Sequence, residues 1–168
     1  MELQMSIGQS NALTGHGHDI VVLSTTVVLP VAFVLFFRAA GSGDHVVALA
    51  GTWFVFWGIG IRLLVAGILQ VVRPSLTAAG ILGIADPAAE KLVRELGIAN
   101  IAMGLLATAS LVVPAWTAPA AFLGAVFLGL AGLRHGSERS RTRPQNLAMV
   151  TDLLVAAVAL GYLLLASR

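Results

Sequence analysis

The amino-acid sequence predicts an all-α integral membrane protein, a bundle of about five transmembrane helices. Hydrophobic residues make up 58% of the 168-residue chain and charged residues only 11%, whereas soluble domains carry about 25% charged residues. The apolar residues gather in long runs, most of them close to the roughly 20 residues that a helix needs to cross a bilayer. Lipid is therefore the solvent expected for most of the surface.

Residues 1–19 form the expected polar N-terminal tail, and residues 20–168 a single transmembrane domain. The tail contains no Lys or Arg, whereas a secretory signal begins with basic residues followed at once by an apolar core. We therefore expect the first span to be retained. His16 and His18 with the adjacent Asp19 have the composition of a metal site, but the favoured interpretation is a solvated helix entry with Asp19 as its N-cap.

The first two apolar segments have features that disturb a regular helix. Residues 20–37 contain no charge, and Pro30 is expected to kink them. Residues 46–72 would form a helix about 40 Å long, against a hydrocarbon core of about 30 Å. This segment is expected to tilt, protrude or break, with Gly58 and Gly60 as its weakest point.

Three further apolar segments cover residues 96–113, 120–133 and 147–166. The turn at 114–119 allows only an antiparallel hairpin, and the segment that follows it is short for a span unless its flanks extend it. The mostly apolar connection at 73–90 is interpreted as a helix on the membrane surface rather than a loop that dips into a cavity. Five spans are expected, with four spans and one re-entrant segment as the alternative.

Basic residues are concentrated on one side of the expected bundle. Three lie within residues 73–94 and four within residues 134–143, whereas the opposite side carries only Arg38 and Arg168. Cytoplasmic loops are rich in Lys and Arg. We therefore expect a multi-pass protein of the bacterial inner membrane with a cytoplasmic N-terminus and basic loop and an external C-terminus. Topology explains the basic residues, so no nucleic-acid partner is expected.

Polar side chains within the expected spans are the candidate functional residues, because charge in hydrocarbon is costly and rare. Helix rise places Arg62 about 15 Å from the cytoplasmic end of its span and Asn100 about 7.5 Å deeper than Glu95. A compensated pair is expected between Arg62 and either Asp152 or Glu95. The candidate set, all in the cytoplasmic half, is Arg62, Glu95, Asn100, His135 and Asp152, with Gln70 and Asn146 as secondary members.

This polar set has three interpretations: a buried network that fixes helix register, a pocket for a small solute or proton, or a metal or redox site. Glu95, His135 and Asp152 would be the metal ligands, since carboxylates and imidazole bind transition metals. However, no two of them share a helix at ligand spacing. The chain has no cysteine, which excludes disulfides and thiolate sites. We predict no cofactor and no catalytic residue, and favour a non-enzymatic role.

The sequence Arg-Glu-Leu-Gly-Ile-Ala-Asn at residues 94–100, followed by a Gly-rich span, resembles a family of small bacterial membrane proteins broadly similar to DoxX-type four-helix proteins. Those proteins carry an acidic residue and an Ala-Asn pair at the start of a span. The resemblance covers roughly residues 53–166. It extends to a helix-end histidine, an asparagine and an in-span aspartate, which match His135, Asn146 and Asp152.

Two positions differ from this family. Gln70 stands where relatives carry histidine, and residues 85–89 replace an aromatic-rich stretch, so shared metal chemistry is not implied. The leading hypothesis is small-solute or proton binding and transport in the lipid bilayer through a polar pocket, by a homo-oligomer, because five short helices enclose little volume. The resemblance implies the runner-up, an accessory subunit with a membrane redox partner. A structural helix bundle is the third hypothesis.

Overall fold

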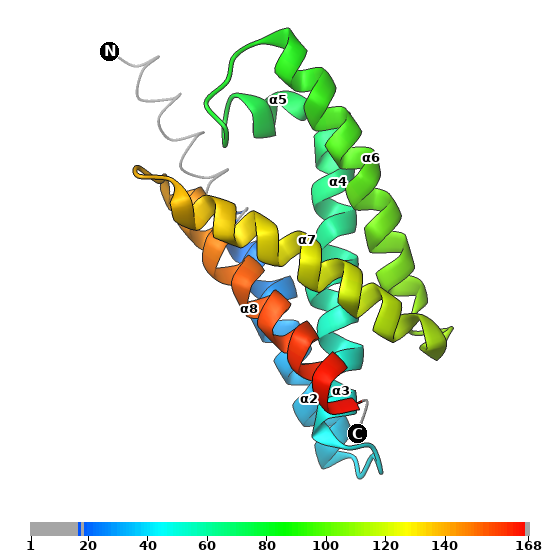
Figure 1. Ribbon diagram of the computed structural model, residues 1–168. Helices are drawn as coiled ribbons and strands as arrows, with labels where there is room; N and C mark the ends of the chain where they lie inside the picture. The colour runs from blue at the N-terminus through cyan, green and yellow to red at the C-terminus, as the bar shows by residue number, and fades with distance from the viewer. Residues whose placement is uncertain (1–16, 18, 167–168) are drawn as a thin grey trace.

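The computed structural model describes residue 17 and residues 19–166, and this part of the chain is an all-α bundle without strands (Figure 1). The predicted fold class is confirmed, since five helices are long and apolar enough to cross a membrane. The first contains the π-helical segment η1 (Ser24–Val28) and α2 (Leu29–Ala39), and the second contains α3 (Val46–Trp53), η2 (Phe54–Ile61) and α4 (Arg62–Val72). The remaining elements are α5 (Pro74–Ala78), α6 (Pro87–Ala109), η3 (Pro114–Trp116), α7 (Thr117–Ser137) and α8 (Arg143–Ala166).

The first span begins earlier than its apolar run. Gly17 and Asp19 already have helical backbone, so the prediction of Asp19 as the N-cap is wrong. Its carboxylate instead pairs with Arg143 at 3.1 Å, which ties the first span to the last. The proposed metal site of His16 and His18 lies outside the residues described.

Pro30 follows directly after the π-helical segment η1, within the first turn of α2. Proline has no backbone N–H and therefore removes one hydrogen bond from a helix interior. The wider π-turns ahead of it accommodate this loss within a continuous helix. The structure thus changes helix type in the turns before Pro30. The expected kink at Pro30 stays a prediction.

The second span passes through Gly58 and Gly60 without a break, as the π-helix η2. Both glycines are buried at close contacts: a Cβ at Gly58 would lie 3.1 Å from Val155 Cγ2, and one at Gly60 would lie 3.0 Å from the backbone nitrogen of Thr108. These glycines serve close helix packing. Of the expected tilt, protrusion or break of this span, the break at this point is wrong.

The last three spans are longer than their apolar cores. The helix α6 begins at Pro87, nine residues before the expected start, because Asp86 caps it: the Ala88 N–H donates to the Asp86 carboxylate at 2.8 Å. Asp at the N-cap and Pro at the first helical position are standard start signals. The helix α7 extends to full span length on both flanks, and α8 begins four residues before its expected start, at Arg143.

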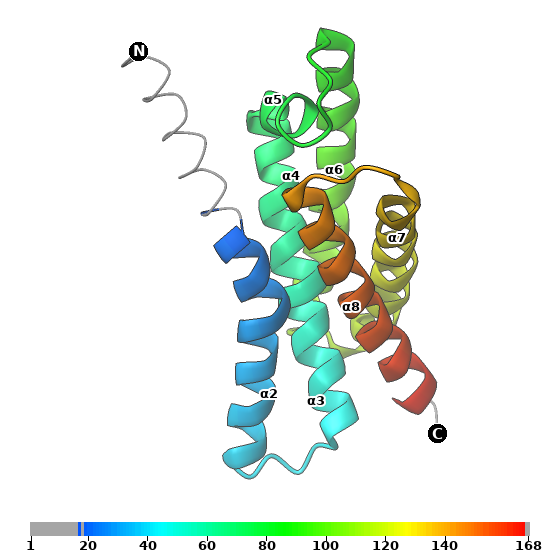
Figure 2. The same ribbon diagram turned by 90° about the vertical axis from the view of Figure 1, so that its left-hand side faces the viewer.

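The helices pack in two close pairs around the second span. The helix α6 lies along α4, and α7 lies along α8, while η2 contacts all of α6, α7 and α8. From the turn that joins them, α6 and α7 diverge (Figures 1 and 2). The short helix α5 packs between α4 and α6 at one end of the bundle.

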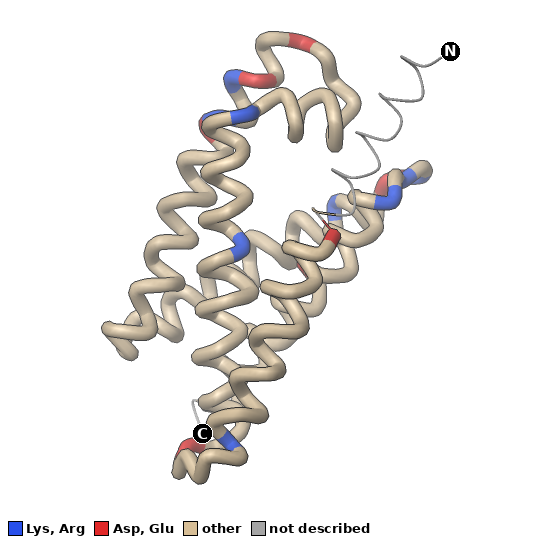
Figure 3. The backbone as a smooth tube through the Cα atoms, turned by 180° about the vertical axis from the view of Figure 1, so that it is seen from behind, with Lys and Arg blue, Asp and Glu red and all other residues tan. Residues whose placement is uncertain are grey.

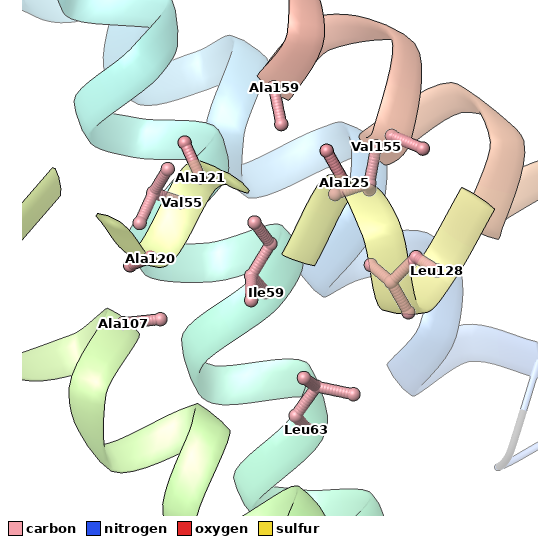
Figure 4. Packing of buried hydrophobic residues seen from close by; sticks show 11 residues of the cluster. Val55, Ile59, Leu63, Ala107, Ala120, Ala121, Ala125, Leu128, Val155 and Ala159 are labelled. Atoms are coloured by element: carbon pink, nitrogen blue, oxygen red, sulfur yellow. The ribbon is translucent and has the colours of Figure 1, made fainter. Parts of the chain in front are cut away.

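The buried core lies at the level of η2, where small side chains predominate (Figure 4). Small residues let helix backbones approach closely, which is what drives helix association in lipid. Three larger residues of the second span, Val55, Ile59 and Leu63, fill the space between them. The others are Ala107, Ala120, Ala121, Ala125, Leu128, Val155, Ala156 and Ala159.

Charged residues lie mainly at the helix ends (Figure 3). The connection between α4 and α6 and the connection between α7 and α8 lie at the same end of the bundle, and the connection between α2 and α3 lies at the other (Figures 1 and 2). We call the first of these the basic end, because Lys and Arg residues lie in or beside both of its connections, three within residues 73–94 and four within residues 134–143. The arrangement agrees with the expected odd number of spans.

Candidate functional site

The guanidinium of Arg62, the first residue of α4, forms a buried ion pair with Asp152 on α8. Its Nη2 donates to Asp152 Oδ1 at 2.5 Å and to Thr151 Oγ1 at 3.2 Å. The side chains of Arg62 and Asp152 are only 12% and 7% exposed. The predicted pairing is therefore with Asp152, and Glu95 takes no part in it.

Close packing of α7 against α8 shields this ion pair. A Cβ at Gly132 would lie 3.3 Å from Asp152 Cβ and 2.8 Å from Leu153 Cγ, so the α7 backbone covers this side of the carboxylate. The Thr151 hydroxyl donates to the Leu147 carbonyl at 2.8 Å, which leaves its oxygen free to accept from the arginine. The helices α4 and α8 thus each supply one charge of a compensated pair, in a medium where an isolated charge is costly.

Some polar atoms around this ion pair remain without partners. Arg62 Nη1 and His135 Nδ1 are buried and have no hydrogen-bond partner among the described residues. The nearest carboxylate oxygen to His135 Nδ1 is that of Glu138, at 4.0 Å. His135 lies three residues after Gly132, the α7 residue whose backbone packs against Asp152. We call Arg62, His135, Thr151 and Asp152 the charged cluster.

Two other candidates, Gln70 and Asn100, form a separate site that we call the amide pair. Asn100 Nδ2 donates to Gln70 Oε1 at 2.7 Å, between α6 and α4. Asn100 is buried, and its own Oδ1 has no partner in the described part of the chain. Gln70 follows Arg62 by eight residues, about 12 Å along the helix. The two sites therefore join α4 to different neighbours at different levels.

Four glycines bring the second span and α6 together beside and beyond the amide pair, and we call them the glycine seam: Gly60, Gly67, Gly97 and Gly104. A Cβ at Gly67 would lie 2.6 Å from the Gly97 carbonyl oxygen, and one at Gly104 would lie 2.7 Å from the Leu64 backbone nitrogen. Gly97, Asn100, Gly104 and Ala107 are all buried, and they form the packing face of α6. Contacts this close leave little space between the two backbones beside the amide pair.

The remaining two candidates lie apart from both sites. Glu95 is exposed on α6 and forms no hydrogen bond or ion pair with any residue that the structure describes. Asn146 lies in the first turn of α8, where its Oδ1 accepts from Arg141 Nε at 2.8 Å. Both residues belong to the basic end of the bundle, outside its polar interior.

The carboxylate and imidazole groups proposed as metal ligands do not converge. Glu95 is exposed on α6, whereas Asp152 is buried on α8. Within the described ranges, no group of three or more His, Cys, Asp or Glu side chains is placed to hold a metal ion. The interior chemistry is therefore that of an ion pair with a nearby imidazole.

Sequence reasoning missed Thr151, which precedes Asp152 and accepts from Arg62. Its signal was present: a hydroxyl beside an in-span carboxylate, at a position where threonine can hydrogen-bond to its own helix backbone.

Among curated proteins and among solved structures, none matches this chain. The model of one protein family, DUF6790, described as a family of unknown function, matches residues 19–168. The match includes every transmembrane helix and both interior polar sites, and it begins where the predicted N-terminal tail ends. The chain therefore belongs to the DUF6790 family.

Proposed function

We propose that this protein binds and passes a proton or a small polar solute at the charged cluster, within a multi-pass membrane bundle. The observation that carries the proposal is the buried guanidinium of Arg62, which pairs through Nη2 while its Nη1 has no acceptor among the described residues. A buried donor without a partner calls for an explanation such as a water or a bound molecule.

Stability alone is a poor explanation for the ion pair. Removing two charges from water costs about as much as their attraction returns, and apolar replacements of a buried pair are often neutral or stabilising. Ionisable groups within a membrane commonly mark solute or proton pathways. The charged cluster has the groups for such a pathway, because aspartate and histidine both exchange protons and arginine holds an anionic or carbonyl oxygen.

The side chains become less exposed from the basic end inward. Glu138 is 28% exposed, His135 is 16% exposed and Asp152 is 7% exposed. These three residues supply successive proton acceptors that end at the Arg62 guanidinium. We propose that protons or solutes enter along this series and that Arg62 sets the charge of its inner end.

Proton flux into liposomes tests the proposal. Asp152→Asn keeps an oxygen that accepts from Arg62 but removes the ionisable group, so we expect proton flux to fall at least tenfold at equal amounts of folded protein. Glu95→Gln is the matched control: it neutralises an exposed carboxylate outside the cluster and should leave flux unchanged. Equal flux in wild type and Asp152→Asn would contradict a proton pathway and favour a structural ion pair.

We also propose that the basic end faces the cytoplasm, because Lys and Arg are concentrated there. The chain has no cysteine, so single cysteines report topology directly. In intact cells, a membrane-impermeant maleimide should label Gly43→Cys, between α2 and α3, and leave Ser140→Cys, between α7 and α8, unlabelled. The reverse labelling pattern would invert the orientation.

A further inference from the structure

A cluster of five aromatic rings joins the first two spans near the end opposite the charged connections. We call Phe33, Phe37, Trp53, Phe56 and Trp57 the aromatic cluster. The ring centroid of Phe33 lies 4.5 Å from that of Trp53 and 5.5 Å from that of Trp57, and Phe37 stacks on Trp53 at 5.0 Å. Phe56 meets both tryptophans edge-on.

Both tryptophans of this cluster have unused hydrogen-bond donors. Trp53 Nε1 and Trp57 Nε1 are buried and have no acceptor within the described part of the protein. Trp53 as a whole is only 8% exposed. Buried tryptophan normally finds a hydrogen-bond partner for its N–H, and two neighbouring indoles without one indicate a missing acceptor.

The backbone around the cluster is also unusual. The π-helical segments η1 and η2 pack against each other between the same two spans, and π-turns are frequent at functional sites. Thr26 lies in η1, fully buried, with an unpartnered hydroxyl. Its neighbour Thr25 instead donates to the Val21 carbonyl at 2.9 Å, the usual solution for a threonine within a helix.

A hollow on the surface of α2 lies beside the aromatic cluster. The hollow is lined by Ala32, Phe33 and Phe36, and Phe36 is 65% exposed. The Phe33 ring lines this hollow and contacts both tryptophans. A molecule in this hollow would contact the Phe33 ring, which packs directly against both indoles.

Donor type and ring packing define the ligand. Trp53 and Trp57 lie seven and eleven residues after Val46, about 10 and 16 Å along the helix. Indole N–H groups only donate, so the ligand must bring an acceptor, and the rings around them favour a planar ring.

We infer that the aromatic cluster binds a lipid-soluble ring compound whose carbonyl oxygens accept hydrogen bonds from Trp53 and Trp57. This site is separate from the charged cluster, because it lies between α2 and the first half of the second span. Its occupant has quinone-like chemistry: a planar ring with opposed carbonyls and an apolar tail in the bilayer.

Indole N–H resonances of the ¹⁵N-labelled protein in lipid nanodiscs test this inference. The probe is a decyl-substituted benzoquinone, and decylbenzene is its matched control without acceptors. The benzoquinone should shift the Trp53 and Trp57 N–H protons downfield with saturation, while Trp116, which is 44% exposed in η3, stays unchanged. Decylbenzene should cause no downfield shift.

Variants sharpen the test. Trp53→Phe and Trp57→Phe keep a ring and remove the donor, so each should weaken benzoquinone binding about three- to tenfold, the worth of one hydrogen bond. Trp116→Phe assigns the third resonance and should leave binding unchanged. Equal shifts at all three tryptophans, or no shift at any, would overturn the inference and leave the aromatic cluster as packing alone.

Discussion

The helix α4 carries two interior polar sites that differ in charge and in packing. At its first residue, Arg62 reaches α8 in the charged cluster, and eight residues later Gln70 reaches α6 in the amide pair. The amide pair is neutral and lies where glycines bring two backbones almost into contact. The charged cluster holds full charges and two buried polar atoms without partners among the described residues, Arg62 Nη1 and His135 Nδ1, whereas the amide pair has one, Asn100 Oδ1.

This difference separates a structural role from a functional one. Neutral amides between closely packed helices fix their relative position at little electrostatic cost, and membrane hydrogen bonds of this kind contribute about 0.6–2 kcal/mol. A buried ion pair with an open donor contributes little net stability for its cost. We therefore assign helix register to the amide pair and solute or proton handling to the charged cluster.

The largest effect is expected from breaking the charged cluster on one side only. Asp152→Leu leaves the Arg62 guanidinium buried without a counter-charge, which should lower the free energy of unfolding by about 3–5 kcal/mol. The double variant Arg62→Met with Asp152→Leu removes both charges and should recover to within about 1 kcal/mol of wild type. Unfolding in mixed micelles with increasing SDS measures both values.

The double variant distinguishes the two roles. Recovered stability together with lost proton flux would show that the ion pair is kept for its chemistry. A double variant as unstable as Asp152→Leu would contradict this assignment, because the pair itself would then be holding α4 against α8.

The same comparison shows what the sequence could predict. Apolar runs located all five spans, and helix depth placed Arg62 and Asp152 in the same half of the membrane. The partner choice between Asp152 and Glu95 also depends on direction around the helix. Glu95 lies five residues from Asn100, about 140° around a helix at 3.6 residues per turn, so it points away from the packing face that Asn100 occupies.

Other features depended on tertiary contacts that no local pattern contains. The π-helical form of η2, whose glycines pack against α6 and α8, was not predicted, because local sequence indicated a tilt, a protrusion or a break of this span instead. The starts of α6 and α8 lay within polar residues that hydropathy assigned to loops, although the Asp86-Pro87 start signal was visible. The lack of hydrogen-bond acceptors for the indoles of the aromatic cluster depends on how the first two spans pack.

An intermediate effect is expected from crowding the glycine seam. The Cβ of Gly67→Ala would meet the Gly97 carbonyl oxygen at 2.6 Å, and backbone atoms cannot rotate away, so α4 and α6 must separate. Overpacking of this kind costs about 1–3 kcal/mol. Gly129→Ala is the matched control, because its Cβ would lie at an ordinary 3.6 Å from Ala156 Cβ. Equal SDS unfolding curves for the two variants would show that the seam is looser than its geometry indicates.

The smallest effect is expected at the amide pair itself. Asn100→Leu removes one interhelical hydrogen bond and leaves Gln70, which is only partly buried, free to reach other partners, so unfolding free energy should fall by about 1 kcal/mol. Proton flux per folded molecule should stay at the wild-type value, because the Asn100–Gln70 hydrogen bond lies between α4 and α6, about 12 Å along α4 from Arg62. A large loss of flux at preserved stability would place the amide pair in the pathway. The two polar sites of α4 would then form one continuous functional site, and the assignment of register to the amide pair would fail.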